Sequence, residues 1–322
     1  MRIAIWTGIL IGLTGLAFLM AWQGFTTIAD RLADAHWAIF LVAVFALPEL
    51  LLGTAGWRYL FAPNKAPRYW NAVVAMWMGS SVNLLLPVAT IGGDLVKARQ
   101  LIRCSVAGAD AVASVVLDKT VHLISVLLWT LIGLGALISI NPSPRLIMAV
   151  IIGWVVFALG LAGFIVVQRA GAFGWFANLA VNAAKRDWLQ TWVEGATNVD
   201  ARIREVYQRP KAILKSSALT LGARTVMAGE VWLAAHLMGY PIGLDESIML
   251  KSLSIALRNA AFVVPGGLGI QEGSYIVLGA IAGLPADLML SVSLATRLRE
   301  LVASVPGLLA WQYAESRMVW RG

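Results

Sequence analysis

The sequence predicts an all-α, polytopic integral membrane protein, and its composition, its repeated apolar runs and two interrupted apolar stretches favour this fold class. Of 322 residues, 59% are hydrophobic and 13% are charged, whereas soluble domains carry about a quarter charged residues. Apolar runs of about 20 residues, the length that crosses the hydrocarbon core of a bilayer, recur along the chain. We therefore expect a single membrane domain over residues 1–322.

The apolar runs predict about six full spans, at 3–22, 36–56, 115–140, 146–167, 213–239 and 286–313. The longest polar region, 169–215, alternates basic residues with tryptophan and phenylalanine. Aromatic rings and long basic side chains are favoured at the membrane interface, so this region predicts amphipathic helices that lie on the membrane surface.

The first interrupted stretch, 70–105, contains Pro87, Gly92 and Gly93 in an otherwise apolar sequence. Proline lacks a backbone donor and clashes with the preceding turn, and paired glycines loosen the backbone. Broken backbone within hydrocarbon is tolerated only where protein or a water-filled cavity surrounds it. We therefore expect a re-entrant hairpin that lines a polar cavity. Its candidates for substrate contact are Asn83, Asp94, Lys97 and Arg99.

The second interrupted stretch, 247–284, repeats the same order of residue types. Asn259 is followed by Pro265, Gly266, Gly267 and Gly269, and then by the acid Glu272. The chain thus divides into halves, 1–168 and 169–322, with one interrupted hairpin each. Hairpins that enter from opposite sides are typical of transporters built from inverted repeats. Because the spacings differ between the two stretches, an arrangement without inverted repeats stays open.

Lys and Arg gather near the N-terminus, in 58–68, in 169–215 and in the C-terminal tail, whereas 24–36 and 240–247 hold mainly acids. Because basic loops stay in the cytoplasm, both termini are predicted to be cytoplasmic. The basic residues lie between apolar runs, so they indicate no nucleic-acid partner, despite the net charge of +8. The single cysteine excludes an internal disulfide, and three widely separated histidines indicate no metal site. We expect no cofactor.

Charged side chains inside spans are costly and are functional candidates by default. Arg224 and Glu230 are six residues apart and do not share a helix face, so each needs a partner elsewhere, whereas Arg297 and Glu300 can pair at three apart. Arginine suits phosphate or carboxylate recognition, so an anionic head group is favoured, although the acids also allow a cationic group or proton coupling. The deep candidates for substrate contact are Arg224, Glu230, Arg258, Glu272, Arg297, Arg299 and Glu300.

Asp118, Lys119 and His122, near the start of the span 115–140, are candidates for coupling, and Asp118 and His122 share a helix face. A structural alternative stays open for each cluster. Asp118 and Lys119 equally fit a charge pair at a helix end, and the pair formed by Arg297 and Glu300 fits a lock between helices. Glu49 is expected to be a buried acid bonded to a neighbouring helix.

Two motifs carry a resemblance to a known family: Pro87…Gly92-Gly93-Asp94…Arg99 and Pro265-Gly266-Gly267-Leu268-Gly269…Glu272-Gly273. With the order of spans, they make nearly the whole chain resemble the flippase-like transmembrane domain of lysylphosphatidylglycerol synthases, as a stand-alone member. The segment LLPVATIGGDLVKARQL is similar to the branch associated with bacterial hopanoid biosynthesis clusters. The resemblance implies a bacterial inner-membrane protein with re-entrant helices, in which Asn83 and the residues of the two motifs serve lipid translocation. It implies no synthase activity, which resides in a separate soluble domain of that family.

The leading hypothesis is therefore a lipid flippase or translocase that moves a polar-headed or hopanoid-type lipid without covalent chemistry. An integral membrane transferase is an alternative, although no nucleophile motif, phosphate-binding loop or metal-binding helix supports it. A scaffold for lipid-biosynthesis enzymes is a third. Membrane lipids are the expected partners, and a homo-oligomer or lipid-biosynthesis partners stay open.

Overall fold

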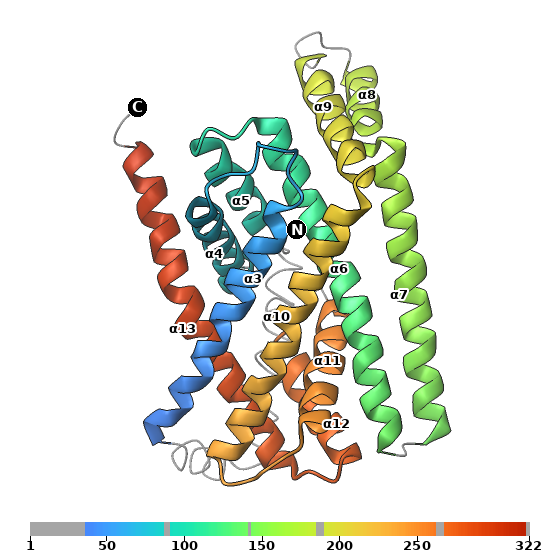
Figure 1. Ribbon diagram of the computed structural model, residues 1–322, viewed down its shortest axis with the longest axis vertical. Coiled ribbons are helices and arrows are strands. Elements are labelled where there is room, and N and C mark those ends of the chain that lie inside the picture. Colours follow the sequence, from blue (N-terminus) through green and yellow to red (C-terminus); the bar gives the residue numbers. More distant parts are fainter. Residues whose placement is uncertain (1–35, 87–90, 141–142, 185–189, 262–266, 320–322) are drawn as a thin grey trace.

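The computed structural model describes residues 36–86, 91–140, 143–184, 190–261 and 267–319. This part of the chain is all-α and contains no β-strand, as the sequence predicts (Figure 1). Its helices in chain order are η1 (His36–Phe45), α3 (Ala46–Arg58), α4 (Tyr69–Leu85), α5 (Gly92–Arg103), α6 (Gly108–Ser139), α7 (Pro144–Ala170), α8 (Ala172–Ala184), α9 (Gln190–Tyr207), α10 (Pro210–Leu237), α11 (Leu244–Ala260), α12 (Ile270–Ile281) and α13 (Ala286–Val319).

The long helices run between an upper and a lower end of the bundle in the view of Figure 1. In the described part of the chain, three helical stretches are long and apolar enough to cross a membrane: Ala38–Arg58, Gly108–Ser139 and Pro144–Ala170. Helices α10 and α13, with 28 and 34 residues, are also long enough to cross, but charged side chains lower their hydropathy. The predicted span 3–22 lies outside the described residues.

Both interrupted stretches form helical hairpins. Hairpin 1 consists of α4 and α5 and occupies the upper half of the bundle, and hairpin 2 consists of α11 and α12 and occupies the lower half (Figure 1). Helix α6 follows hairpin 1 in the chain, and α13 follows hairpin 2. Each hairpin packs on the long helix that follows the other hairpin: α4 lies against α13, and α11 lies against α6. Each also packs on the long helix that follows itself, α5 on α6 and α12 on α13. Helices α6 and α13 therefore support both hairpins.

Helices α8 and α9 differ from the expectation of helices lying flat on a surface. They pack against each other and project beyond the upper ends of the other helices (Figure 1). Asp200 of α9 accepts hydrogen bonds from the backbone amides of Phe173 and Gly174, at 3.3 and 2.6 Å. Arg204 donates to the carbonyls of Arg169 and Ala170 at the end of α7. These bonds join α9 to the turn between α7 and α8, which keeps the pair upright.

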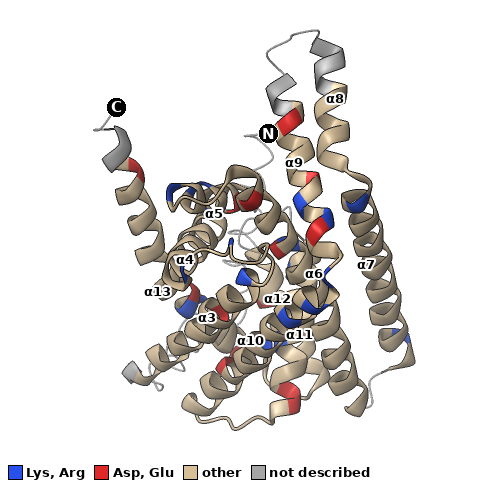
Figure 2. Cartoon of the chain, turned by 45° about the horizontal axis from the view of Figure 1, so that its top comes forward, with Lys and Arg blue, Asp and Glu red and all other residues tan. Residues whose placement is uncertain are grey.

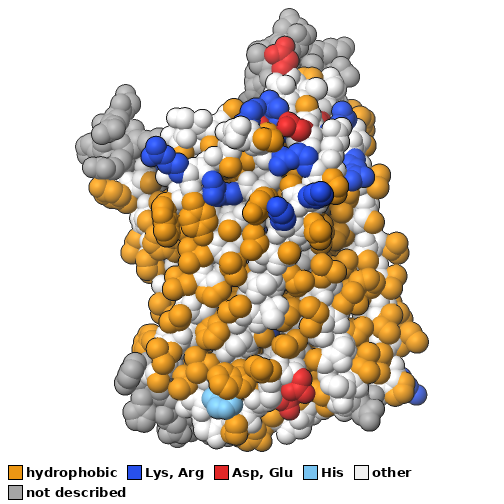
Figure 3. Space-filling view, viewed as in Figure 1, with side chains coloured by type: hydrophobic (Ala, Val, Ile, Leu, Met, Phe, Trp, Pro, Cys, Tyr) orange, Lys and Arg blue, Asp and Glu red, His pale blue; other side chains and the backbone are white. Residues whose placement is uncertain are grey.

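The surface shows why the bundle fits a membrane. Figure 3 shows a wide hydrophobic belt below a row of Lys and Arg that crosses the upper third of the molecule. Helix α7 contributes to the belt, with Val156, Leu159 and Val166 more than 60% exposed. Large exposed apolar surface of this extent marks contact with lipid or with another protein. The lower end carries the acids Asp245 and Glu246 at the start of α11.

Candidate functional site

The end of hairpin 1 is closed by one side chain and by close backbone packing. The Gly93 amide donates to Asn83 Oδ1 at 2.7 Å, which joins the start of α5 to the end of α4. A methyl group on Gly93 would collide with the Gly79 carbonyl oxygen, so the two helices cross where only glycine fits. Gly92 is the first residue of α5, and the predicted break residue Pro87 lies outside the described residues.

The charges that follow Gly93 turn toward α6. Lys97 is buried and its Nζ lies 3.1 Å from Asp118 Oδ2 and 3.9 Å from Asp94 Oδ1. Lys119 reaches Asp94 at 3.0 Å. The predicted coupling residues Asp118 and Lys119 thus join hairpin 1 to α6, as a pairing of two helices rather than as a pair at one helix end. Arg99 does not join this group, because it is 60% exposed and pairs with Glu315 of α13 at 3.3 Å.

The end of hairpin 2 is also closed by its own side chains. Gly267 and Gly269 have φ angles of +61° and +78°, which glycine adopts without strain. The Gly269 amide donates to Glu272 Oε2 at 2.7 Å, so this acid caps the start of α12. Arg297 binds Glu272 at 2.9 Å and donates to the Gly267 carbonyl at 3.0 Å. Pro265 and Gly266 lie outside the described residues.

A second layer of contacts holds hairpin 2 to α13. Glu300 accepts from Arg258 at 2.5 Å and from Arg297 at 3.1 Å, which confirms the expected pairing of Arg297 with Glu300. Arg258 also donates to Gln271 Oε1 at 2.8 Å, and Gln271 in turn donates to Thr296 at 2.9 Å. Gln271 is not among the predicted residues, because an uncharged amide gives no signal in the sequence until its burial, here 4% exposed, is known.

Glu230 is a central acid that contacts two cations on other helices. It is fully buried and contacts Lys251 of α11 through one carboxylate oxygen and Arg299 of α13, at 2.5 Å, through the other. Arg299 also lies 3.5 Å from Glu49 and 3.8 Å from Glu300. Glu49 therefore does contact a neighbouring helix, but its side chain is 52% exposed, so the expectation of a buried acid was wrong.

Arg224 completes the central group and lies between the two hairpins. Its Nη2 lies 3.0 Å from Nδ1 of His122 on α6. The same Nη2 lies 3.4 Å from the other ring nitrogen, Nε2, and the ring is also within hydrogen-bond reach of the Asn259 side chain, at the end of α11. His122 shares its helix face with Asp118, which engages hairpin 1. Arg224 and His122 thus connect the two groups of charges.

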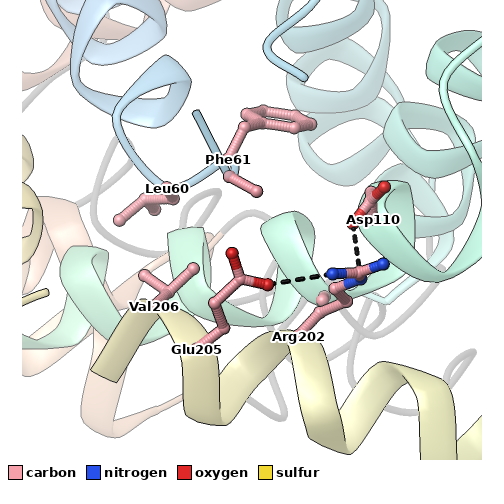
Figure 4. Close-up of a pocket in the computed structure, with 8 residues that line it drawn as sticks. Leu60, Phe61, Asp110, Arg202, Glu205 and Val206 are labelled. Atoms are coloured by element: carbon pink, nitrogen blue, oxygen red, sulfur yellow. Dashed lines mark hydrogen bonds and ion pairs between the residues drawn. The ribbon is translucent and has the colours of Figure 1, made fainter. Parts of the chain in front are cut away.

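Figure 2 shows that residues of both charges occupy helix positions within the bundle as well as at its ends. In the described part of the chain most of the buried ones pair with one another, and Arg224 contacts His122 instead of a carboxylate. The polar cavity expected between the hairpins stays a prediction. A hollow of about 650 Å³ lies at the upper end, between the loop 64–68 and the turn 104–107. Asp110 lines this hollow and pairs with Lys65 at 3.3 Å and with Arg202 at 3.0 Å. Figure 4 shows the pair with Arg202.

Comparison with known proteins identifies the family. The sequence profile of the lysylphosphatidylglycerol synthase TM region matches residues 5–307. The UPF0104 membrane protein PH1989 of Pyrococcus horikoshii is 20% identical over 308 residues, which cover 90% of this chain and 91% of that protein. No solved structure matches this chain. Because the matched region contains both hairpins and all the charges between them, the chain belongs to the family of the lysylphosphatidylglycerol synthase TM region.

Proposed function

We propose that this protein moves a polar-headed lipid between the leaflets of a bacterial inner membrane. One observation carries the proposal: two broken hairpins from opposite ends of the bundle are each held by a set of largely buried charges, one set on α6 and the other on α10 and α13. Buried charges inside a membrane bundle are costly and rare outside sites that handle polar or charged groups. The outer face of α7 is apolar and suits the acyl chains, while the head group would pass between the hairpins. A hopanoid-type lipid is an alternative cargo, on the basis of the resemblance.

In this proposal the upper end faces the cytoplasm, because it carries the row of basic side chains (Figure 3). Both termini are then cytoplasmic, hairpin 1 re-enters from the cytoplasm, and hairpin 2 re-enters from the opposite side. The halves 1–168 and 169–322 would be inverted repeats. The reciprocal packing of α4 on α13 and of α11 on α6 supports this relation, since it places each hairpin against the equivalent long helix of the other half.

The paired network supports a mechanism in which ion pairs are exchanged rather than simply broken. Arg297 contacts Glu272, Glu300 and the Gly267 carbonyl together, so a small shift of α13 could replace one of these contacts by a contact with a head group. Such an exchange avoids leaving an unpaired charge in the interior, which would be costly. Predicted residues on this path are Arg258, Glu272, Arg297, Arg299 and Glu300, together with Asp94, Lys97 and Lys119 on hairpin 1.

The proposal is tested by reconstitution into vesicles that contain a fluorescently labelled phosphatidylglycerol. A reductant added outside bleaches only the outer leaflet unless lipid crosses. We expect wild-type protein to extend bleaching beyond the outer half. Arg297→Gln should slow crossing at least about tenfold, the effect of one lost charge-assisted contact. Arg68→Gln, an exposed change at the upper end, should retain the wild-type rate. Equal bleaching in empty and wild-type vesicles would contradict the proposal.

A scaffold for lipid-biosynthesis enzymes is the second candidate, and the shape of α8 favours it. Trp175 and Phe176 are about 60% exposed and pack edge to face at 4.8 Å, on a helix pair that projects from the bundle. A scaffold predicts that replacing both aromatic residues by Ser abolishes the cellular phenotype while Arg297→Gln retains it. A translocase predicts that Arg297→Gln abolishes the phenotype and that the double Ser variant retains it.

A further inference from the structure

The charges around the two hairpins can be counted, and one of them is left over in the described part of the chain. Around hairpin 1, two cations face two carboxylates: Lys97 and Lys119 against Asp94 and Asp118. Around hairpin 2, four cations face four carboxylates: Lys251, Arg258, Arg297 and Arg299 against Glu49, Glu230, Glu272 and Glu300. The central cation that belongs to neither set is Arg224, which is 6% exposed.

The immediate contacts of Arg224 do not neutralise it. Its Nη2 lies 3.0 Å from His122 Nδ1, and a guanidinium nitrogen can only donate, so this ring nitrogen accepts and the ring is neutral. Arg224 Nε is buried and has no hydrogen-bond partner among the described residues. The carboxylate that acts on Arg224 over a longer distance is Glu49, which is half exposed and engaged with Arg299.

The position of Arg224 suits a ligand that enters from the side of the bundle. Its partner His122 reaches Asn259, which ends the first helix of hairpin 2. The next residues of α10, Thr225 and Val226, are exposed. These two residues point to other faces of the helix, so α10 lies at the outer surface of the bundle, while Arg224 faces inward, toward His122 beside the end of a hairpin.

We propose that Arg224 binds the negatively charged group of the transported lipid, a phosphate or carboxylate, and that the other central cations hold the hairpins. An unpaired charge is costly inside a protein and inside a membrane, and a ligand that brings one negative charge would remove this cost. Nε and a terminal nitrogen of one guanidinium form the fork that binds two oxygens of such a group. This inference rests on the proposed function and adds the charge of the substrate and the residue that reads it.

The binding test uses purified protein in neutral detergent and measures thermal unfolding during titration with phosphatidylglycerol, phosphatidylcholine or diacylglycerol. We expect phosphatidylglycerol to stabilise wild-type protein at a concentration about tenfold lower than phosphatidylcholine, the factor for one lost ionic contact. Arg224→Gln should remove this preference, and Arg68→Gln should retain it. A preference that survives in Arg224→Gln, or its absence in wild-type protein, overturns the inference. Glycerol phosphate is titrated in parallel, to show whether a soluble anion alone stabilises the protein through Arg224. Full stabilisation by glycerol phosphate would assign the site to a soluble anion and contradict a lipid site.

A second measurement distinguishes a ligand-binding role from a structural one. Without lipid, Arg224→Met should leave the unfolding temperature unchanged or raise it, whereas Arg299→Met should lower it, because only Arg299 has carboxylate partners to lose. A decrease in Arg224→Met as large as that in Arg299→Met overturns the inference. These readouts need no transport. If lipid fails to cross but the preference for the anionic lipid depends on Arg224, the binding site is supported and the proposed translocation is contradicted. If lipid crosses but the preference does not depend on Arg224, translocation is supported and Arg224 is not its binding residue.

Discussion

Replacing Glu230 by Gln should strongly destabilise the protein, because Glu230 neutralises two buried cations at once. Its carboxylate is fully buried and contacts both Lys251 and Arg299. After the change, Arg299 still lies near Glu49 and Glu300, at 3.5 and 3.8 Å. Lys251, 5% exposed, would keep no carboxylate partner in the described part of the chain.

The magnitude follows from the cost of leaving one member of a buried pair without its partner, which is about 3–5 kcal/mol. Denaturation with SDS in mixed micelles, followed by helical circular dichroism, measures the free energy of unfolding. The matched control is Glu205→Gln. That acid is 37% exposed, and its partner Arg202 retains Asp110 at 3.0 Å. We expect a loss below about 1 kcal/mol there, as for other exposed pairs.

A double variant makes the reasoning refutable. Glu230→Gln combined with Lys251→Met removes both the acid and the cation that it leaves behind. If the loss in the single variant comes from an unpaired lysine, the double variant should recover at least about 2 kcal/mol, within the range of coupling energies of contacting residues. A single variant within 1 kcal/mol of wild type, or a double variant without recovery, would show that this buried pair is not what holds α10 to hairpin 2.

Two further predictions concern packing. Gly93→Ala should lower the free energy of unfolding by about 2–4 kcal/mol, because its methyl group would meet the Gly79 carbonyl. The control is Gly135→Ala, whose added carbon has no atom within 4 Å. It should raise the free energy of unfolding by up to about 1 kcal/mol. The same SDS titration measures both, and equal effects would contradict the close crossing of α4 and α5. Asp200→Ala should speed hydrogen exchange of the amides in 173–174, because their acceptor is lost and caps of this kind contribute about 1 kcal/mol; unchanged exchange there would show that Asp200 does not hold α8.

The hairpins could be predicted from the sequence because their signals are local. Glycine pairs and a proline disfavour a continuous helix through local backbone effects, and the structure has α4 end at 85 and α5 begin at 92. The pairing of Arg297 with Glu300 was predictable for the same reason, since three residues of one helix fix the distance. The need of Arg224 and Glu230 for partners on other helices also followed from their spacing.

The identity of those partners could not be predicted, because it depends on which helices the bundle brings together. Lys251 lies 21 residues from Glu230 and Arg299 lies on the last helix, and no spacing rule connects them. The same limit explains why Arg99 was expected at the centre: its helix was placed correctly, but the face that it occupies turns toward Glu315. Without knowledge of the pairs, the sequence shows only an excess of deep cations, whereas the structure places a carboxylate beside Lys251, Arg258, Arg297 and Arg299.

The sharing of α6 and α13 between the hairpins has a mechanical consequence. Helix α13 binds hairpin 2 through Arg297 and Glu300, and it binds α5 of hairpin 1 through Glu315. Helix α6 engages hairpin 1 through Asp118 and packs along α11 of hairpin 2. A shift of either long helix that releases one hairpin must therefore strain the contacts of the other. Because both hairpins cannot easily be released together, this arrangement favours opening toward one end at a time, which is the property that a translocase of charged head groups requires.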